Sequence, residues 1–312
     1  MRVSVLLVGV AALLLGTGSG LVSRASADDA TSCVKASGDE AIAACTRAIA
    51  SGEFQGHNLA ALYVNRCSVN HAKGDYDRAI ADCNEAIRLD PKFAEAYNNR
   101  GNAYYAKGNY DRAIADASEA IWLDPSLALA YNNRGNAYYA KGDYDRAIAD
   151  ASEAIRLDPK YMVAYFGRGR LYLYAGLLPK ALADLNQASA LNPKDAYAAL
   201  WLDIVNKRSN LPSQLADAAL LIDMTEWPSP VIRLYLGQMT PKAVLAAADN
   251  PNANTKNGQV CEANFYTGEL DLQQGKKDDA TRLFRLAAAN CPKTFIEYEG
   301  ATAELKALGA EP

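Results

Sequence analysis

Residues 96–125 read AYNNRGNAYYAKGNYDRAIADASEAIWLDP, and residues 130–159 repeat this stretch as AYNNRGNAYYAKGDYDRAIADASEAIRLDP. The two copies differ at two positions only, Asn109/Asp143 and Trp122/Arg156. Neither copy alternates polar and apolar residues as a strand would, and the distance between the copies is typical of helix hairpins that stack into a solenoid. The stretch therefore predicts an all-α fold.

Each copy predicts two helices joined by a short turn at a Lys-Gly pair, residues 107–108 in the first copy. Asn109 follows the pair, and its side chain can cap the second helix by accepting from free backbone N–H groups. Apolar residues then recur from Ala113 with the i, i+3, i+4 spacing of an amphipathic helix. Asp124-Pro125 ends that helix, because proline cannot continue the backbone hydrogen-bond ladder and restricts the residue before it.

The residue types at fixed positions of the repeat resemble those of the tetratricopeptide repeat (TPR) family. In the first copy they are Tyr97, Gly101, Tyr104, Ala113, Ala120 and Pro125. The resemblance implies a right-handed solenoid of helix hairpins with almost no strand. Full copies are expected at about residues 60–93, 94–127, 128–161 and 162–195.

The chain departs from the family at one position of each copy, where arginine stands in place of the usual leucine. An aspartate follows each arginine at one constant spacing, which gives the pairs Arg66/Asp82, Arg100/Asp116, Arg134/Asp150 and Arg168/Asp184. We interpret these as ion pairs that cross each hairpin. The alternative is that the charges are solvated on an outer face.

Residues 1–27 have the pattern of a signal peptide. Arg2 precedes an apolar stretch at residues 3–15, and Ala25-Ser26-Ala27 predicts cleavage after Ala27. The mature chain is expected to be periplasmic and not inserted in the membrane. Residues 30–33 are only partly like a lipobox, because alanine stands where leucine is expected, so lipidation of Cys33 is the alternative.

The net charge of −4 argues against a nucleic-acid partner, since such binding depends on lysine and arginine neutralising phosphates. An anionic membrane surface is disfavoured for the same reason.

The six cysteines favour disulfides in an exported chain, because that compartment is oxidising. Several connectivities are open, but hairpin geometry favours neighbours, and the expected pairs are Cys33–Cys45, Cys67–Cys83 and Cys261–Cys291. No metal site is expected, because the chain has no CxxC motif and its only histidines are His57 and His71.

The chain divides into five predicted segments. They are a signal peptide (1–27), an N-terminal helical cap (28–59), four repeats (60–195), a degenerate helical region (196–260) and a TPR-like hairpin with a capping helix (261–312). A capping helix covers the apolar face that the last repeat of a solenoid would otherwise expose. Residues 249–258, DNPNANTKNG, predict a loop.

The C-terminal third resembles a narrower group, the periplasmic lipoprotein NlpI and its relatives. The short segments that carry this resemblance are residues 199–202, 235–237, 264–268, 280–290 and 295–297. NlpI proteins are dimeric adaptors that bind peptidoglycan hydrolases and a processing protease. The resemblance implies a similar scaffolding role and a possible homodimer, without identical partners.

No catalytic motif is present beyond the signal peptide. HExxH, GxSxG, P-loop and GxGxxG patterns are all missing, and two histidines leave little for general base catalysis. Most aspartates of the repeats recur with the repeat period, which suggests structural roles. We therefore expect a non-enzymatic protein without a cofactor.

The candidate site is a row of polar residues on the first helices of the repeats, which line the concave groove of such a solenoid. Asparagine can pair with any peptide backbone, because its amide both donates and accepts, and other TPR superhelices have a similar asparagine ladder. We expect these side chains to be exposed, with two tyrosines nearby and Arg170 supplying a cation for an acidic side chain or a C-terminal carboxylate. The predicted peptide-binding residues are Asn65, Asn99, Asn102, Tyr105, Asn133, Asn136, Tyr139 and Arg170. The alternative is that duplication copied a solvated polar face.

The sequence thus favours a periplasmic adaptor that binds a protein or peptide partner in a concave groove, with envelope or peptidoglycan-maintenance enzymes as the specific expectation. The first alternative is a structural or envelope-assembly factor that acts through self-association. A hydrolase is the third hypothesis.

Overall fold

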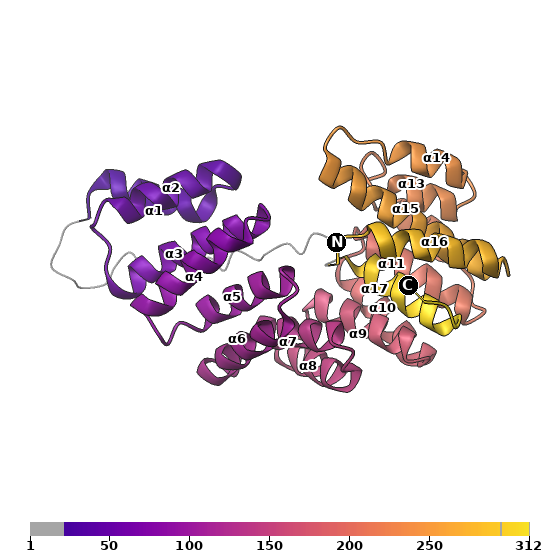
Figure 1. Ribbon diagram of the computed structural model, residues 1–312, viewed down its shortest axis with the longest axis horizontal. Coiled ribbons are helices and arrows are strands. Elements are labelled where there is room, and N and C mark those ends of the chain that lie inside the picture. Colours follow the sequence, from indigo (N-terminus) through magenta and orange to yellow (C-terminus); the bar gives the residue numbers. More distant parts are fainter. Residues whose placement is uncertain (1–21, 294, 312) are drawn as a thin grey trace. The chain divides into compact units, whose positions relative to one another are not determined.

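The computed structural model describes residues 22–293 and 295–311 (Figure 1). These residues form 17 helices and no strand, which confirms the all-α prediction. Most of the predicted signal peptide, residues 1–21, lies outside this range. Within the described part, no helix is both long and apolar enough to cross a membrane. The chain divides into two compact units at residue 158/159, inside the predicted array of four repeats.

The first unit is described from residue 22 to residue 158 and consists of four stacked hairpins. Its helices are α1 (Arg24–Lys35), α2 (Gly38–Ala50), α3 (Gly56–Ala72), α4 (Tyr76–Leu89), α5 (Ala94–Ala106), α6 (Tyr110–Leu123), α7 (Ala128–Ala140) and α8 (Tyr144–Leu157). Each odd-numbered helix packs against the even-numbered helix that follows it, and α3, α5 and α7 also contact one another in turn. Figure 1 shows these hairpins following each other along the unit.

The ends of the second helices follow the sequence signals. The side chains of Asp75, Asn109 and Asp143 cap α4, α6 and α8 by accepting from the backbone N–H three residues on. Gly108 has φ +75°, a left-handed conformation that glycine adopts without strain, and it completes the turn after α5. Each of the three helices ends immediately before an Asp-Pro pair, as α6 does at Leu123.

Close approach within a hairpin depends on a glycine. A Cβ added to Gly101 would lie 3.2 Å from the carbonyl oxygen of Ala113 and 3.2 Å from the Cβ of Asp116. In the preceding repeat Cys67 stands at the position of Gly101, and it is bonded to Cys83 on the facing helix. The same close approach therefore accommodates either a glycine or a disulfide.

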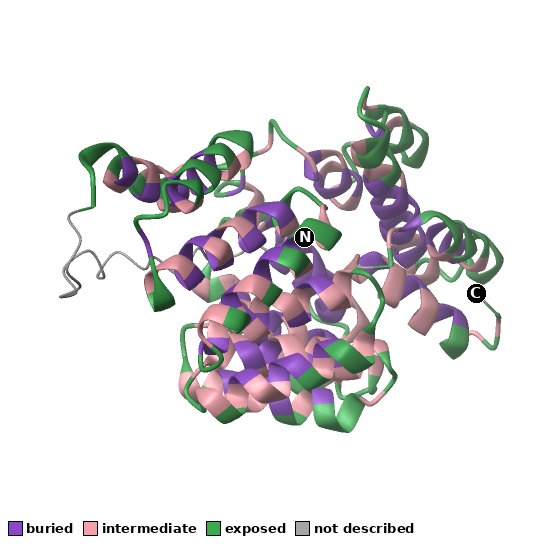
Figure 2. Cartoon of the chain, turned by 60° about the vertical axis from the view of Figure 1, so that its left-hand side comes forward, coloured by how far each residue is buried: buried purple, intermediate pink, exposed green. Residues whose placement is uncertain are grey.

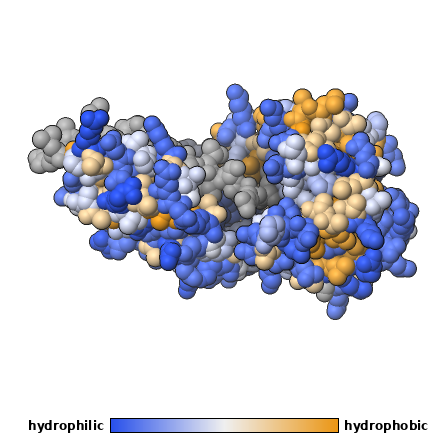
Figure 3. All heavy atoms as spheres, turned by 90° about the horizontal axis from the view of Figure 1, so that it is seen from above, coloured by the Kyte–Doolittle hydropathy of each residue, from blue (hydrophilic) through white to orange (hydrophobic). Residues whose placement is uncertain are grey.

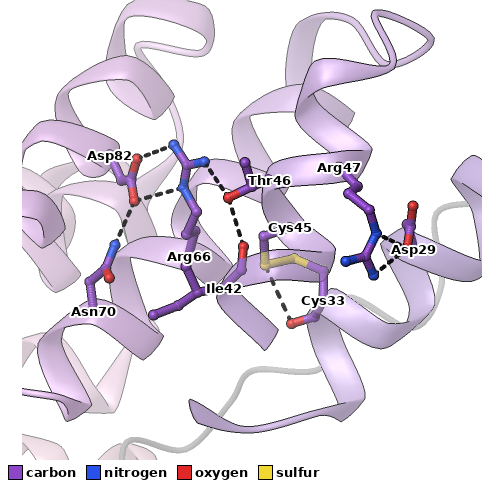
Figure 4. The surroundings of a disulfide bond; sticks show 9 residues. All are labelled: Asp29, Cys33, Ile42, Cys45, Thr46, Arg47, Arg66, Asn70 and Asp82. Carbon is purple, nitrogen blue, oxygen red and sulfur yellow. Dashed lines mark hydrogen bonds and ion pairs between the residues drawn. A yellow bond between two sulfur atoms is a disulfide. The ribbon is translucent and has the colours of Figure 1, made fainter. Parts of the chain in front are cut away.

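All three expected disulfides are present, with Cα–Cα distances of 4.5 Å for Cys33–Cys45, 5.7 Å for Cys67–Cys83 and 4.9 Å for Cys261–Cys291. These distances lie in the usual range for disulfides. The first pair joins α1 to α2 (Figure 4). No cysteine among the described residues is free.

The second unit, residues 159–311 of the described chain, begins with a further repeat hairpin. Its helices are α9 (Met162–Tyr174), α10 (Leu178–Leu191), α11 (Ala196–Arg208), α12 (Leu215–Ala219), α13 (Ser229–Tyr235), α14 (Pro241–Ala247), α15 (Ala253–Gln273), α16 (Lys277–Asn290) and α17 (Ile296–Ala307). Helices α15 and α16 form the TPR-like hairpin, and α17 packs on both. The loop predicted at residues 249–258 is wrong in its second half, because Asn252 caps α15 and the helix starts at Ala253.

The core of the second unit surrounds Trp201, whose ring stacks on Phe265 and meets Phe166 edge-on. Residues 198–206 of α11 and 261–269 of α15 are buried at every position, so these two helices are enclosed on all sides there. The repeat helices instead alternate buried and exposed positions (Figure 2). On the surface, large exposed leucines such as Leu220 and Leu245 belong to this unit, and Figure 3 shows hydrophobic patches on it.

Candidate peptide-binding surface

The repeated arginines and aspartates form two-fold hydrogen-bonded ion pairs. Arg100 donates from Nε and Nη2 to the two carboxylate oxygens of Asp116, at 2.8 and 2.7 Å. The same geometry recurs in Arg66–Asp82, Arg134–Asp150 and Arg168–Asp184. The aspartate side chains are about one-tenth exposed and the arginines about one-fifth. The predicted ion pairs are confirmed, and the alternative of solvated charges is wrong.

Three of these arginines also bond to the preceding hairpin. Arg100 donates from Nη1 to Asn84 of α4 at 2.7 Å, and Arg134 donates to Ser118 of α6 at 3.2 Å. Figure 4 shows the first member of the series, Arg66, between Asp82 and Thr46 of α2. Each of these guanidinium groups therefore connects three helices, and it fixes the odd-numbered helix against the even-numbered helices on both sides.

The predicted asparagines lie on α3, α5 and α7, the helices held by these arginines. Asn133 of α7 donates to Oδ1 of Asn98 on α5 at 2.9 Å, and Asn98 donates to Asn99 at 3.3 Å. The amides therefore form a hydrogen-bonded chain between two successive repeats. Asn98 is 1% exposed and was not among the predicted residues, although its recurrence at Asn132 was visible in the sequence.

Exposure of the asparagine row is uneven. Asn65 of α3 is 5% exposed, so the prediction that this side chain lies open to a ligand is wrong. Neighbouring apolar residues Ala61, Leu62 and Val69 of the same helix are buried with it. Asn99, Asn102, Asn133 and Asn136 are partly exposed. The accessible amides thus belong to α5 and α7.

Aromatic rings lie one turn beyond the asparagines. Tyr105 packs on Tyr110 and Tyr139 packs on Tyr144, each with ring centroids 5.5 Å apart. The corresponding residue of α3 is His71, whose ring lies 5.3 Å from Tyr76. Burial lowers the pKa of His71 below its ordinary value, so the imidazole is neutral at pH 7.

Sequence reasoning did not select His71 for this row. The sequence could have indicated it, because His71 occupies the same position in its repeat as Tyr105 does in the next copy.

Arg170 has another role. Its guanidinium pairs with Glu299 of α17 at 2.6 Å, lies 5.1 Å from the Trp201 ring centre and is 8% exposed as a residue. The charge of Arg170 is neutralised by Glu299 inside the core of the second unit. Arg170 therefore forms no part of the surface proposed below.

The described residues offer no metal centre, since no three His, Cys, Asp or Glu side chains gather into a suitable group there. What α5 and α7 present together is a polar surface of amide groups bordered by tyrosine rings, on helices fixed by the arginines. Such a surface can exchange hydrogen bonds with a polypeptide backbone and pack against side chains.

Family comparisons assign the repeats. A family model described as TPR repeat matches residues 69–108 and 101–142, and one described as Tetratricopeptide repeat matches residues 128–161. Residues 69–161 are tetratricopeptide repeats. Arrays of such repeats present extended surfaces on which other proteins bind, so this part of the chain has the architecture of a protein-interaction scaffold.

Solved TPR proteins resemble the chain at low identity. A TPR protein of Thermus thermophilus is 21% identical over 59% of this chain and 91% of its own, with a TM-score of 0.47. The pilF protein of Pseudomonas aeruginosa is 17% identical over 78% of this chain and 97% of its own, with a TM-score of 0.49. The first TPR of Spaghetti, bound to an HSP90 peptide, is 26% identical over 38% of this chain and 95% of its own, with a TM-score of 0.37.

Proposed function

We propose that this protein is a non-enzymatic scaffold that holds an extended segment of a partner protein on the amide surface of α5 and α7. The observation that supports the proposal is a set of four partly exposed asparagines, two of them hydrogen-bonded to Asn98, with a tyrosine ring one turn further along each helix. The asparagines are Asn99, Asn102, Asn133 and Asn136, and the rings are those of Tyr105 and Tyr139.

The hydrogen bonds between asparagines favour binding, because they already restrict the side chains and so reduce the conformational entropy that is lost when a partner binds. Asn133 and Asn99 are both bonded to Asn98, so their amides are already oriented. Asparagine is a poor helix former, so its recurrence in α5 and α7 does not serve helix stability. This favours a binding role over a merely solvated face.

The affinity should be modest. Each neutral hydrogen bond contributes about 1 kcal/mol net, and the ordering of a flexible segment offsets part of the sum. Four amides and two rings therefore support a dissociation constant on the order of micromolar, with loose sequence preference.

We place the protein in the periplasm, with envelope or peptidoglycan-maintenance enzymes as partners. Three disulfides support an oxidising compartment. The choice of partners rests on the short sequence segments of the C-terminal third that resemble the NlpI group. Cys33 is fully buried in its bond to Cys45, which disfavours lipidation. The intact mass of the exported chain tests this directly: a start at Asp28 is expected, and a lipid on Cys33 would contradict it.

Self-association is the second candidate function. Leu220 and Leu221 of the second unit are 84% and 54% exposed, and adjacent exposed leucines can seat a second copy of the chain. Sedimentation of the full chain separates this candidate from the first, because a scaffold for other proteins need not associate with itself.

The decisive experiment for the amide surface is partner capture from a periplasmic extract. The variant Asn102→Ala/Asn136→Ala should lose capture at unchanged thermal stability. A matched control is Asn186→Ala/Asn290→Ala, which removes two exposed asparagines whose amides bond to carbonyls of their own helices, α10 and α16. Capture that survives in the first variant would place the interaction elsewhere on the chain.

A further inference from the structure

Four buried glutamates lie on α15 and α17 in the second unit. Glu262 and Glu269 belong to α15, Glu297 and Glu304 belong to α17, and each of the four is at most 4% exposed. Within each helix the two glutamates are seven residues apart, which is two helical turns, so both lie on the same face of their helix. We refer to these four residues as the α15–α17 glutamates.

Hydrogen bonds show that the two pairs face one interface. Arg208 of α11 donates from Nη2 to Glu269 at 2.6 Å and to Glu304 at 2.7 Å, so it holds one carboxylate from each helix. Two turns before Glu304 on α17, the carboxylate of Glu297 accepts from the hydroxyl of Tyr266 on α15 at 3.0 Å. The α17 glutamates therefore lie directly against α15.

Glu262 is the fourth member of the set. Its Oε2 accepts from the hydroxyl of Tyr197 at 2.8 Å and from the indole N–H of Trp227 at 2.7 Å. Burial, together with the nearby charge of Glu297, raises the pKa of Glu262 to about 7. Burial also raises the pKa of Glu269 to about 7. Both carboxyl groups of α15 thus retain protons to a much higher pH than an exposed glutamate does.

The charges around these glutamates do not balance. Within the described part of the chain, Arg208 is the one cation that pairs with any of them, and no side chain of α13, α14 or α16 forms a hydrogen bond or ion pair with them. Asp203 and Lys207 of α11 pair with each other. The tyrosines that face the set stay neutral, because burial raises the pKa of each: Tyr197, Tyr235 and Tyr266.

Full ionisation would therefore place four negative charges against one guanidinium in a site that is closed to water. Buried charge without a partner is costly, and carboxyl groups in such a site retain protons instead. The closed interface is thus favoured by proton binding.

Helix α17 closes over aromatic residues of the core. Gly300 lies so close to Phe265 that an added Cβ would be 2.6 Å from its ring, and Phe265 stacks on Trp201. The ion pair of Glu299 with Arg170 joins α17 to α9 as well. Docking of α17 therefore covers the ring of Phe265 and, in the same step, brings two carboxylates against those of α15.

We propose that docking of α17 on α15 is coupled to proton binding by the α15–α17 glutamates, so that α17 is held closed at acidic pH and opens more often as the pH rises. As the carboxyl groups ionise, like charges on the two helices repel each other. For a carboxyl whose pKa rises from 4.5 in the open state to about 7 in the closed state, the stabilising contribution is complete below pH 4.5 and is lost as the pH rises through 7. This device lies entirely in the second unit and does not depend on the amide surface of α5 and α7.

The test is hydrogen exchange of the full chain between pH 5 and pH 8, read by mass spectrometry at α17 and corrected for the intrinsic pH dependence of amide exchange. The equilibrium constant for opening of α17 should rise at least about tenfold over this range. Helix α10 of the same unit and α2 of the first unit serve as internal references, and their exchange should change less. Corrected exchange in α17 that stays constant, or that rises equally in α10, would overturn the proposal.

Variants assign the effect to the glutamates. Glu262→Gln should remove part of the pH dependence at α17, and Glu262→Gln/Glu269→Gln should remove most of it and keep α17 closed at pH 8, because the amides stay neutral. The matched control Glu311→Gln changes an exposed carboxylate just beyond α17 and should behave as the unaltered protein. If the double variant fails to fold, the comparison of α17 with α10 in the unaltered protein still decides. A pH dependence that survives undiminished in the folded double variant would refute the assignment to these residues.

Discussion

Loss of Asp116 should destabilise the first unit through the arginine that it leaves behind. In the native protein Arg100 makes two hydrogen bonds to Asp116 and one to Asn84, and its charge lies 5.4 Å from the ring centre of Tyr97. Asp116→Ala removes the carboxylate that accepts two of these three hydrogen bonds from Arg100. The arginine side chain is one-fifth exposed, so water can compensate only in part.

The magnitude follows from this partial burial. Removing one partner of a fully buried ion pair costs about 3–5 kcal/mol, and an exposed pair contributes less than about 1 kcal/mol. The retained bond to Asn84 and the partial exposure of Arg100 place Asp116→Ala between these limits, at about 2–3 kcal/mol. The double variant Asp116→Ala/Arg100→Leu should recover most of that loss, because leucine leaves no charge to solvate.

Urea unfolding is the suitable assay, because urea does not screen charges as guanidinium chloride does. The four free energies of the cycle should give a coupling of about 2 kcal/mol between Arg100 and Asp116. The exposed pair Arg156–Glu153 on α8 is the control, and Glu153→Ala should leave the free energy of unfolding nearly unchanged. A coupling near zero for Arg100 and Asp116 would refute the view that these pairs hold the repeats together.

Two further predictions concern stability. Burial, reinforced by the nearby Glu297 charge, raises the pKa of Glu262 to about 7 from an unfolded value near 4.5, so its stabilising contribution is complete below pH 4.5 and is lost as pH rises through 7. The titration of Glu262 should therefore make the second unit about 2–3 kcal/mol more stable at pH 5 than at pH 8. Burial raises the pKa of Glu269 to about 7 as well, so Glu262→Gln should remove about half of the combined pH dependence in pH-resolved urea unfolding. For the disulfide of α3 and α4, Cys67→Gly/Cys83→Ala installs the residue types of the next repeat and should cost about 3 kcal/mol, as expected for cysteines separated by 16 positions. An equally stable variant would show that the next repeat's packing fully replaces the bond.

The sequence predicts the hairpins, their caps and the ion pairs well, because each depends on residues that recur with the repeat. Arg100 and Asp116 keep the same spacing in every copy, so one hairpin suffices to pair them. The disulfides follow from the same local geometry.

The sequence-based predictions are wrong or incomplete where a side chain's surroundings are not determined by the 34-residue repeat. The repeat register of Arg170 predicts a place in the groove, but its partner Glu299 lies far along the chain, on a helix outside the repeats. The burial of Asn65 depends on how α3 packs against its neighbours, and the position of this residue in the repeat does not reveal that packing. The buried carboxylate of Glu262 accepts hydrogen bonds from Tyr197 and Trp227, which lie far from it along the chain, and no local motif marks it.

Site-specific photo-crosslinking tests the central claim most directly. A photoreactive phenylalanine analogue is placed at Tyr105 or Tyr139, beside the amide surface, and at Trp122, which is 73% exposed on α6. After irradiation in intact cells, positions 105 and 139 should crosslink to the same partner protein, and position 122 should not. Crosslinks from position 122 alone would contradict the proposed binding surface.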